Sequence, residues 1–260
     1  MTLDQTLFFT DSGSGDAVIL LHGMVGSHRY WDKIIPRLKS SYRVIAFDLL
    51  GFGQSPKPKD IEYTLDDHIS ALMKSIDSLN LKTFILVGHS MGSIISLGIA
   101  DKYPDRVTKL VLISMPIYKT AADAKQKITR SKIMPKLMLY GLTARITCTL
   151  VCYFHPLMKR LAPIFITNVP KNVAVDSLDH TWHSYSRSML HVIQEQDVLG
   201  QLNLLSMPTT ILVGLKDAII NEYEPNKLGA LSTNITVRLM DTTHQLPLED
   251  PSSVLKAIRD

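Results

Sequence analysis

A serine, an aspartate and a histidine each follow a predicted strand of this chain, in a setting suited to nucleophilic chemistry. Ser90 lies in the pentapeptide Gly-His-Ser-Met-Gly at residues 88–92, which fits the pattern G-x-S-x-G. Asp217 and His244 come later, each on a turn or loop after an apolar segment. A serine hydroxyl is a poor nucleophile at neutral pH, so it needs a nearby base and a carboxylate that orients that base. The three residue types together predict acyl transfer at Ser90, with His244 as the base and Asp217 as the orienting acid.

The turn around Ser90 is the segment that must hold this nucleophile. Residues 84–87 (FILV) form a short apolar run, which is the pattern of a strand buried on both faces of a parallel sheet. Glycines at 88 and 92 let this strand and the following helix cross closely, and the helix N-terminus directs N–H groups at any anion formed beside Ser90. The alternative is a strand-to-helix turn that carries no chemistry.

Two later loops carry the expected base and acid. His244 follows the predicted strand 235–240, in a loop from which an imidazole can reach over the turn at Ser90. Asp217 follows the predicted strand 207–213. The alternatives are a surface histidine and an ordinary turn aspartate. Of the competing carboxylates, Asp241 is expected to serve its own turn and Asp48 to hold the loop at residues 51–53.

Acyl transfer also requires two N–H donors for the oxyanion that forms on the substrate carbonyl, and the loss of one such donor costs roughly 3 kcal/mol. We expect these donors to be the backbone amides of Met91, at the start of the helix, and Met24, on the loop after the strand 17–21. Because backbone atoms donate, the two side chains say little about the site. His22 is expected to brace its loop, and His89 to pack or hydrogen-bond locally.

The spacing of apolar residues predicts alternating strands and helices over most of the chain. The expected strands are 6–10 (at an edge), 17–21, 42–47, 84–87, 107–114, 207–213 and 235–240, and the expected helices are 30–38, 64–79, 91–103 and 251–260. Alternation with short connections implies an α/β fold with a mostly parallel, doubly wound sheet. The reactive loops of such a sheet gather at the carboxyl ends of its strands, so the three candidate residues should share one edge.

The alternation stops between residues 116 and 201, where the chain is helical or irregular and rich in Met, Leu and Ile. We therefore expect a core of residues 1–115 and 202–260, with a helical cap of residues 116–201 inserted before the penultimate strand. Met134, Leu137, Met138 and Leu142 are candidates for an apolar substrate pocket under this cap. The favoured alternative is that they form the core of the cap, with the other apolar residues Ile133, Leu139, Ile146, Leu150, Val151, Tyr153 and Phe154.

Basic residues gather at the start of the cap, at Lys125, Lys127, Arg130, Lys132 and Lys136. A solvated face is the favoured interpretation, and peripheral contact with an anionic lipid surface is the alternative. His180, His183 and His191 lack a metal-ligand spacing with acidic partners, so we expect no metal and no cofactor, and interpret these histidines as cap packing.

Length, net charge and cysteine content limit the classes of protein to which this chain could belong. The 260 residues suit one large α/β domain, and the net charge of +4 is too mild to indicate a nucleic-acid partner. Cys148 and Cys152 lie four residues apart on one expected helix, as packed thiols in a reducing compartment would. The first residues show no secretory signal, no apolar run could span a bilayer, and no internal repeat is visible. A cytoplasmic protein is the expectation, and the oligomeric state stays open.

These motifs together resemble the α/β-hydrolase superfamily. The resemblance rests on His22-Gly23-x-x-Gly26-Ser27, Asp48-x-x-Gly51-x-Gly53-x-Ser55, the GHSMG turn, Asp217 and His244, and it covers nearly the whole chain outside the cap. The similar branches are the single-lid esterases, the lipases and the carbon–carbon bond hydrolases. A serine at position 90 argues against the dehalogenase and epoxide-hydrolase branches, which use an aspartate there. Ser93 departs from the glycine that often follows this turn.

The resemblance implies a carboxylic ester hydrolase, which acts on a small-molecule ester with an apolar acyl or alcohol part. A second candidate is a carbon–carbon bond hydrolase of ring-cleavage products, whose usual pattern has Asn before the nucleophile and Trp after the catalytic histidine. This chain has His89 and Gln245 at those positions. A third candidate is a ligand receptor or an inactive relative that keeps the fold.

Overall fold

The computed structural model contains one seven-stranded sheet among the residues that it describes, which are 6–118, 120, 122–124, 126, 141–218 and 228–260. Its strands are β1 (Phe9–Ser12), β2 (Ala17–Leu21), β3 (Arg43–Phe47), β4 (Phe84–His89), β5 (Val107–Ile113), β6 (Thr209–Gly214) and β7 (Ile235–Met240). They lie in the order β1-β3-β2-β4-β5-β6-β7, and every neighbouring pair is parallel except β1 with β3. The expected parallel, doubly wound sheet and the edge position of β1 are confirmed, although β1 begins at Phe9 rather than Thr6.

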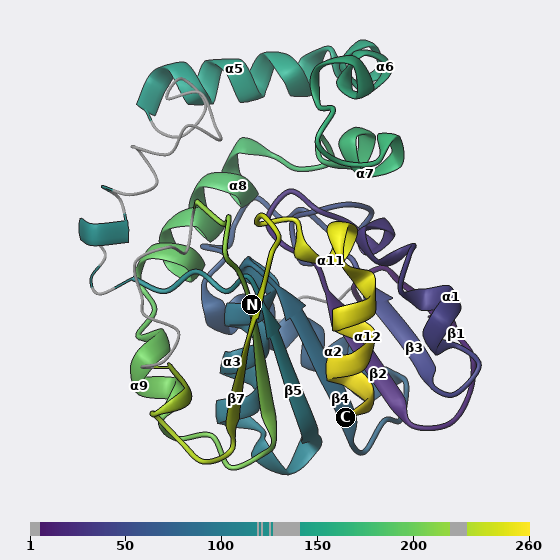
Figure 1. Cartoon of the computed structure of the whole chain (residues 1–260). Coiled ribbons are helices and arrows are strands. Elements are labelled where there is room, and N and C mark those ends of the chain that lie inside the picture. Colours follow the sequence, from purple (N-terminus) through teal and green to yellow (C-terminus); the bar gives the residue numbers. More distant parts are fainter. Residues whose placement is uncertain (1–5, 119, 121, 125, 127–140, 219–227) are drawn as a thin grey trace.

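Helices cover both faces of this sheet (Figure 1). On one face lie α2 (Leu65–Ser78) and α3 (Met91–Lys102), and on the other lie α1 (Ile35–Leu38) and α12 (Pro251–Arg259). Each face has its own apolar core, and β2 and β6 are buried along their whole length. Burial on both sides explains why these strands are continuous apolar runs instead of alternating ones.

Two helices show how local sequence sets the boundaries. The Thr64 side chain accepts a hydrogen bond from the Asp67 amide, and the Asp67 carboxylate accepts one from the Thr64 amide, so a capping box starts α2 where the sequence predicted. The single helix expected over residues 30–38 is wrong. The chain instead forms a 3₁₀ turn, η1 (His28–Trp31), followed by the short helix α1. Pro36 has no N–H to donate to the preceding turn, which ends the continuous helical ladder there.

A short 3₁₀ turn, η2 (Pro104–Arg106), precedes β5, and the described elements between β5 and β6 are all helical. They are α5 (Gly141–Tyr153), α6 (His155–Phe165), α7 (Lys171–Asp176), α8 (Trp182–Ser188), the π-helical turn η4 (Met189–Gln194) and α9 (Val198–Leu202). A last short helix, α11 (Leu246–Glu249), follows β7. Helices α5 to α8 stand above one end of the sheet, as a cap would (Figure 1).

The cap helices dock on loops that follow two of the strands. The Ser184 hydroxyl of α8 donates a 2.9 Å hydrogen bond to the Gly51 carbonyl, in the loop after β3. The Ser27 hydroxyl, in the loop after β2, donates to the Asp176 carboxylate of α7 over 2.6 Å. Because both loops leave the carboxyl ends of parallel strands, these bonds hold the cap at the edge where reactive loops gather.

Candidate active site

Ser90 lies between β4 and α3 in a backbone conformation that non-glycine residues rarely adopt. Its φ is +53° and its ψ is −120°, and its amide donates a 2.9 Å hydrogen bond to the Ile113 carbonyl of β5. Such strain persists only where the surrounding structure enforces it. Here the enforcement is close packing, because a Cβ on Gly92 would lie 2.5 Å from the carbonyl oxygens of Leu21 and His22. The two glycines of the pentapeptide are therefore required by the crossing of α3 over the sheet.

Ser90, His244 and Asp217 form a hydrogen-bonded series. His244 Nε2 lies 3.0 Å from Ser90 Oγ, and His244 Nδ1 lies 2.7 Å from Asp217 Oδ2. The carboxylate can only accept, so Nδ1 carries the proton and Nε2 presents its lone pair to the serine hydroxyl. Asp217 is fully buried, and the His244 side chain is only 13% exposed. The competing carboxylate, Asp241, points to solvent and forms an ion pair with Lys216 at 2.9 Å.

Backbone contacts between the loops after β6 and β7 bring the acid to the histidine. The Leu215 amide donates to the Met240 carbonyl over 2.8 Å, and the Lys216 amide donates to the Thr242 carbonyl over 2.9 Å. Gly214 allows this approach, since a Cβ there would lie 2.6 Å from the Thr242 carbonyl oxygen. Asp217 therefore reaches His244 because its own turn is tied to the histidine loop.

The two amides expected to bind an oxyanion flank Ser90 from different loops. Met91 is the first residue of α3, and Met24 lies on the loop after β2. Neither amide has an acceptor among the described residues, so both remain available to a substrate oxygen. Gly23 brings the Met24 loop against the nucleophile, because a Cβ on Gly23 would lie 3.1 Å from the Ser90 Cβ.

His22 and Asp48 brace the loops around the site, as the sequence predicted. His22 Nδ1 donates to the Gly23 carbonyl over 2.6 Å, and His22 Nε2 accepts from the Leu49 amide over 2.9 Å. Burial lowers the pKa of His22, which keeps the neutral ring that this pattern needs. The Asp48 carboxylate accepts from the Gln54 amide at 2.7 Å and contacts His28 Nδ1 at 2.8 Å. Burial alone would raise the pKa of Asp48, but these hydrogen bonds outweigh it and lower the pKa.

His89 has a wider role than the local packing expected from the sequence. Its Nε2 donates a 2.8 Å hydrogen bond to the backbone carbonyl of His244, and its ring stacks on Tyr30 with the ring centroids 4.6 Å apart. The Tyr30 hydroxyl donates to the Gln245 side-chain oxygen over 2.8 Å. Burial lowers the pKa of His89 well below its usual value, so the ring is neutral. Tyr30 and Gln245 are far apart in the chain, and nothing in their sequence setting signals this support for the histidine loop.

The cap residues named from the sequence have mixed outcomes. Met134, Leu137 and Met138, and the basic residues from Lys125 to Lys136, lie outside the described residues. Leu142 is on α5 and is 70% exposed, so its side chain lines no enclosed pocket in this structure. Four other cap residues expected in a pocket or core are also exposed: Ile146, Leu150, Tyr153 and Phe154. The expectation that these five side chains line a pocket or form the core of the cap is therefore wrong, because they form an apolar face that none of the described residues covers.

The three cap histidines form hydrogen bonds or ion pairs with other residues of the chain. His180 Nδ1 donates to the Ser177 carbonyl over 2.9 Å, and His183 Nε2 donates to the Ile61 carbonyl over 2.8 Å. His191 pairs with Glu195 at 2.7 Å. The described residues contain no group of three or more His, Cys, Asp or Glu side chains arranged to hold a metal ion.

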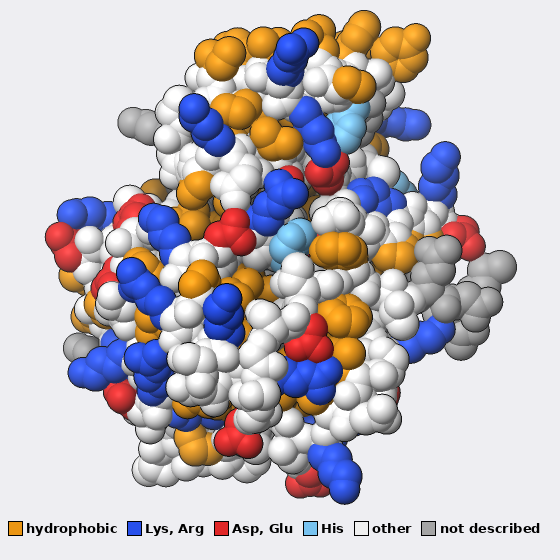
Figure 2. Space-filling view, turned by 90° about the vertical axis from the view of Figure 1, so that its right-hand side faces the viewer, with side chains coloured by type: hydrophobic (Ala, Val, Ile, Leu, Met, Phe, Trp, Pro, Cys, Tyr) orange, Lys and Arg blue, Asp and Glu red, His pale blue; other side chains and the backbone are white. Residues whose placement is uncertain are grey.

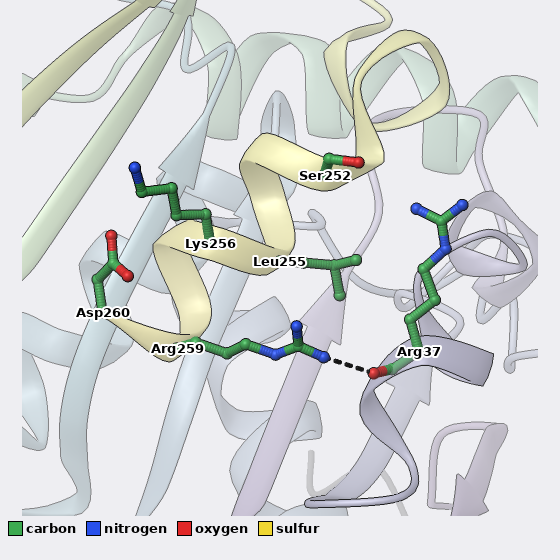
Figure 3. Close-up of a pocket in the computed structure, with 6 residues that line it drawn as sticks. All are labelled: Arg37, Ser252, Leu255, Lys256, Arg259 and Asp260. Atoms are coloured by element: carbon green, nitrogen blue, oxygen red, sulfur yellow. Dashed lines mark hydrogen bonds between the residues drawn. The ribbon is translucent and has the colours of Figure 1, made fainter.

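A separate hollow of about 530 Å³ lies between α1 and α12 (Figure 3). It is lined by Arg37, Ser252, Leu255, Lys256, Arg259 and Asp260. Arg259 reaches across it and donates a 2.8 Å hydrogen bond to the Arg37 carbonyl. None of the candidate catalytic residues lines this hollow, so it plays no part in the chemistry considered for Ser90.

Comparison with known proteins agrees with the fold. A model of the alpha/beta hydrolase fold family matches residues 16–138. A thermophilic esterase from Thermogutta terrifontis superposes with a TM-score of 0.72 and 25% identity, covering 97% of this chain and 91% of that one. The chain belongs to the α/β-hydrolase superfamily.

Two curated relatives are similar to this chain over part of their length. Probable lysophospholipase BODYGUARD 4 of Arabidopsis thaliana is 33% identical over 189 residues, which are 68% of this chain and 45% of that protein. The 2-hydroxymuconate semialdehyde hydrolase of a Pseudomonas species is 38% identical over 115 residues, 41% of each chain. This α/β-hydrolase chain thus spans less than half the length of the curated relatives that it matches. None of the helices in the described ranges has the length and hydropathy needed to cross a bilayer.

Proposed function

We propose that this chain is a serine hydrolase that cleaves carboxylic esters with an apolar acyl or alcohol part. The observation that carries the proposal is the series of contacts from Ser90 through His244 to Asp217, at 3.0 and 2.7 Å. Such a series lets an imidazole remove the proton of a serine hydroxyl while a buried carboxylate stabilises the resulting imidazolium. No metal or cofactor takes part in the proposed reaction.

The reaction would proceed in two acyl-transfer steps. In the first, His244 Nε2 takes the Ser90 proton as the serine oxygen attacks the ester carbonyl carbon, and the negative charge moves to the carbonyl oxygen. The amides of Met24 and Met91 would hold that oxygen at the N-terminus of α3. The imidazolium then protonates the departing alcohol, which leaves an acyl group on Ser90. Water, deprotonated by His244, attacks this acyl-enzyme and releases the acid.

The apolar part of the substrate is inferred from what surrounds the site loops. Met91 and Met115, which follow β4 and β5, belong to the same apolar cluster as Tyr185 and Met189 of the cap. Met24, on the oxyanion loop, is only partly buried and packs against this cluster. Ligand sites are mostly apolar with a few polar groups that fix orientation. The similarity to an esterase and to a probable lysophospholipase also favours an ester.

The test is covalent labelling combined with ester turnover. A fluorophosphonate should label the protein on Ser90, and p-nitrophenyl esters of short and medium chain length should give a burst of p-nitrophenol. Ser90→Ala should abolish both. Ser114→Ala is the matched control, because Ser114 also follows a central strand with a positive φ of 49°. It should keep both signals, and a wild-type protein that is not labelled would refute the proposal and favour a receptor or inactive relative.

Carbon–carbon bond hydrolysis remains the second candidate because of the similarity to the semialdehyde hydrolase. His89 and Gln245 differ from the residues usual in that branch, and here they form the network that holds the histidine loop. Labelling of Ser90 without turnover of any p-nitrophenyl ester, together with cleavage of a ring-cleavage product, would favour this candidate over the esterase.

A further inference from the structure

The outer surface of the cap carries an unusual concentration of exposed apolar side chains. Eight of the thirteen large apolar side chains that are exposed among the described residues fall between residues 142 and 165. Large apolar side chains exposed singly need no explanation, but a contiguous group marks an interaction surface. Figure 2 shows hydrophobic side chains (orange) gathered along the top of the molecule, where the cap lies.

These side chains form stripes on two consecutive helices. On α5 the stripe has helical spacing, and on α6 it continues toward the end of the helix. We call this surface the outer cap face: Leu142, Ile146, Leu150, Tyr153 and Phe154 of α5 and its end, and Leu157, Ile164 and Phe165 of α6. Ala144 and Ala162, on the other sides of these helices, are buried. A surface helix usually turns its large apolar side chains toward the core, but α5 and α6 turn theirs to the outside and bury only the small alanines.

Among the described residues, the charged side chains that α5 and α6 themselves carry are all basic. Arg145 of α5 and Arg160 of α6 are exposed, and neither helix contains an acidic residue. In the sequence, no Asp or Glu occurs from residue 124 to residue 175, a stretch with nine Lys and Arg. The carboxylate that does reach α6 from elsewhere, Asp179, is paired with Lys159 at 2.7 Å and His155 at 3.1 Å. Within the described part of the chain, the face thus combines exposed apolar side chains with positive charges that no carboxylate pairs.

We propose that the outer cap face docks on the surface of an anionic phospholipid membrane. Apolar side chains enter the boundary between headgroups and acyl chains, and Arg145 and Arg160 meet the lipid phosphates, as in helices that lie in the membrane plane. The aromatic rings of Tyr153 and Phe154, whose centroids are 5.0 Å apart, suit the interfacial depth. A second copy of this chain fits less well, because a two-fold contact would bring two faces of the same charge together.

Docking would place lipid at the end of the molecule where Ser90 lies. The cap stands over the carboxyl ends of the strands, and α8 connects it to the loop after β3 (Figure 1). A membrane on the outer cap face would supply esters with long apolar parts to this end. That last step depends on the proposed hydrolase function, but binding itself does not, so the two can be tested separately.

The binding test uses the full chain carrying Ser90→Ala, so that hydrolysis cannot change the vesicles. The protein is sedimented with vesicles of phosphatidylcholine alone or of phosphatidylcholine mixed with phosphatidylserine, at low and high salt. We expect binding to the mixed vesicles, weaker at high salt. Arg145→Gln with Arg160→Gln should reduce the partition coefficient by about fivefold per charge. Leu150→Ser with Tyr153→Ser should reduce it about tenfold or more.

Matched controls come from exposed residues elsewhere. Leu204→Ser removes a side chain that is 74% exposed but lies outside the outer cap face, and Lys39→Gln with Lys82→Gln removes two exposed charges. Both controls should bind vesicles as the parent protein does. Unchanged melting temperatures would show that every variant is folded.

Three results would overturn the proposal. The first is no binding to mixed vesicles, and the second is equal weakening by the controls and the cap variants. The third is a dimer in sedimentation velocity that Leu150→Ser dissociates in a protein that does not bind vesicles, which would assign the face to a second copy. If vesicles bind but no ester is hydrolysed by the wild type, the docking surface stands and the proposed function fails.

Discussion

Replacing Asp217 by Asn tests the proposed catalytic series at its most informative point. In the wild type, His244 Nδ1 donates to the Asp217 carboxylate over 2.7 Å, which leaves Nε2 unprotonated opposite Ser90. An asparagine is nearly the same size, but its amide can donate to Nδ1. The imidazole would then carry its proton on Nε2, where it cannot accept the proton of the serine. The substitution keeps the shape of the site and reverses the tautomer.

The expected loss is large because two effects act together. The base is held in the wrong tautomer, and the buried negative charge that stabilises the imidazolium in the transition state is gone. In a serine protease with the same series, this change lowers kcat by about 10⁴-fold. At about 1.4 kcal/mol per tenfold change, that is a rise of roughly 5–6 kcal/mol in the activation free energy. We expect a loss of this order for Asp217→Asn.

The assay is the rate of p-nitrophenyl butyrate hydrolysis, with fluorophosphonate labelling as a second measure of Ser90 reactivity. Asp241→Asn is the matched control, because Asp241 is the neighbouring carboxylate and its side chain is 76% exposed. Its ion pair with Lys216 is at the surface, so removing it should change the rate by less than about twofold. If Asp217→Asn kept more than a tenth of the wild-type rate, the assignment of the acid would be wrong.

Three further predictions follow from the packing around the site. Gly92→Ala should lower the free energy of unfolding by about 1–3 kcal/mol, and with it the melting temperature, because the new Cβ would lie 2.5 Å from the Leu21 carbonyl oxygen. Tyr30→Phe removes the hydrogen bond to Gln245 and should lower kcat by about two- to tenfold in steady-state assays. His68, which is fully buried, has a pKa lowered by burial to about 4, so only the unfolded chain binds its proton between about pH 6.5 and 4. The free energy of unfolding should therefore decrease as the pH is lowered from about 6.5 to 4, by up to about 3 kcal/mol from this residue. The free energy of unfolding of His68→Gln should decrease less over the same range.

Each of these predictions has a control in the same chain. A Cβ on Gly229 would meet its nearest neighbour, Val237, at an ordinary 3.7 Å, so Gly229→Ala should leave the melting temperature nearly unchanged. His155 is partly exposed, and His155→Gln should keep the acid-induced loss of stability in denaturant titrations. For Tyr30→Phe, an unchanged kcat would show that the histidine loop holds its position without the hydroxyl.

The sheet and the convergence of three loops were accessible from the sequence because each rests on a short-range signal. Apolar runs identify buried strands, and parallel topology places the loops after β4, β6 and β7 at one edge. The proximity of Ser90, Asp217 and His244 follows from this placement, while their catalytic roles remain proposals. The break in the helix expected at residues 30–38 occurs at Pro36, and the apolar spacing of this segment, on which the expectation depends, does not indicate it.

The support of the histidine loop could not be predicted, because it depends on contacts between distant residues. Tyr30 lies 215 positions from Gln245 and 59 from His89, and none of the three has a spacing that signals their meeting. They meet because the fold packs the turn after β2 against the loop after β7. Hydrogen bonds of this kind leave no periodic trace in a sequence.

The outer cap face shows a related limit of sequence patterns. Helical periodicity in α5 indicates that one side is apolar, and a buried core or a pocket lining is the usual reason for such a side. Leu142, Ile146 and Leu150 have the expected spacing, yet all three are exposed. Periodicity therefore establishes that a face exists but not what covers it. If the outer cap face docks on anionic lipid as proposed, charge is the discriminating signal, because a helix that buries its apolar side in its own protein has no need for an acid-free sequence, whereas a helix that meets anionic lipid gains from one.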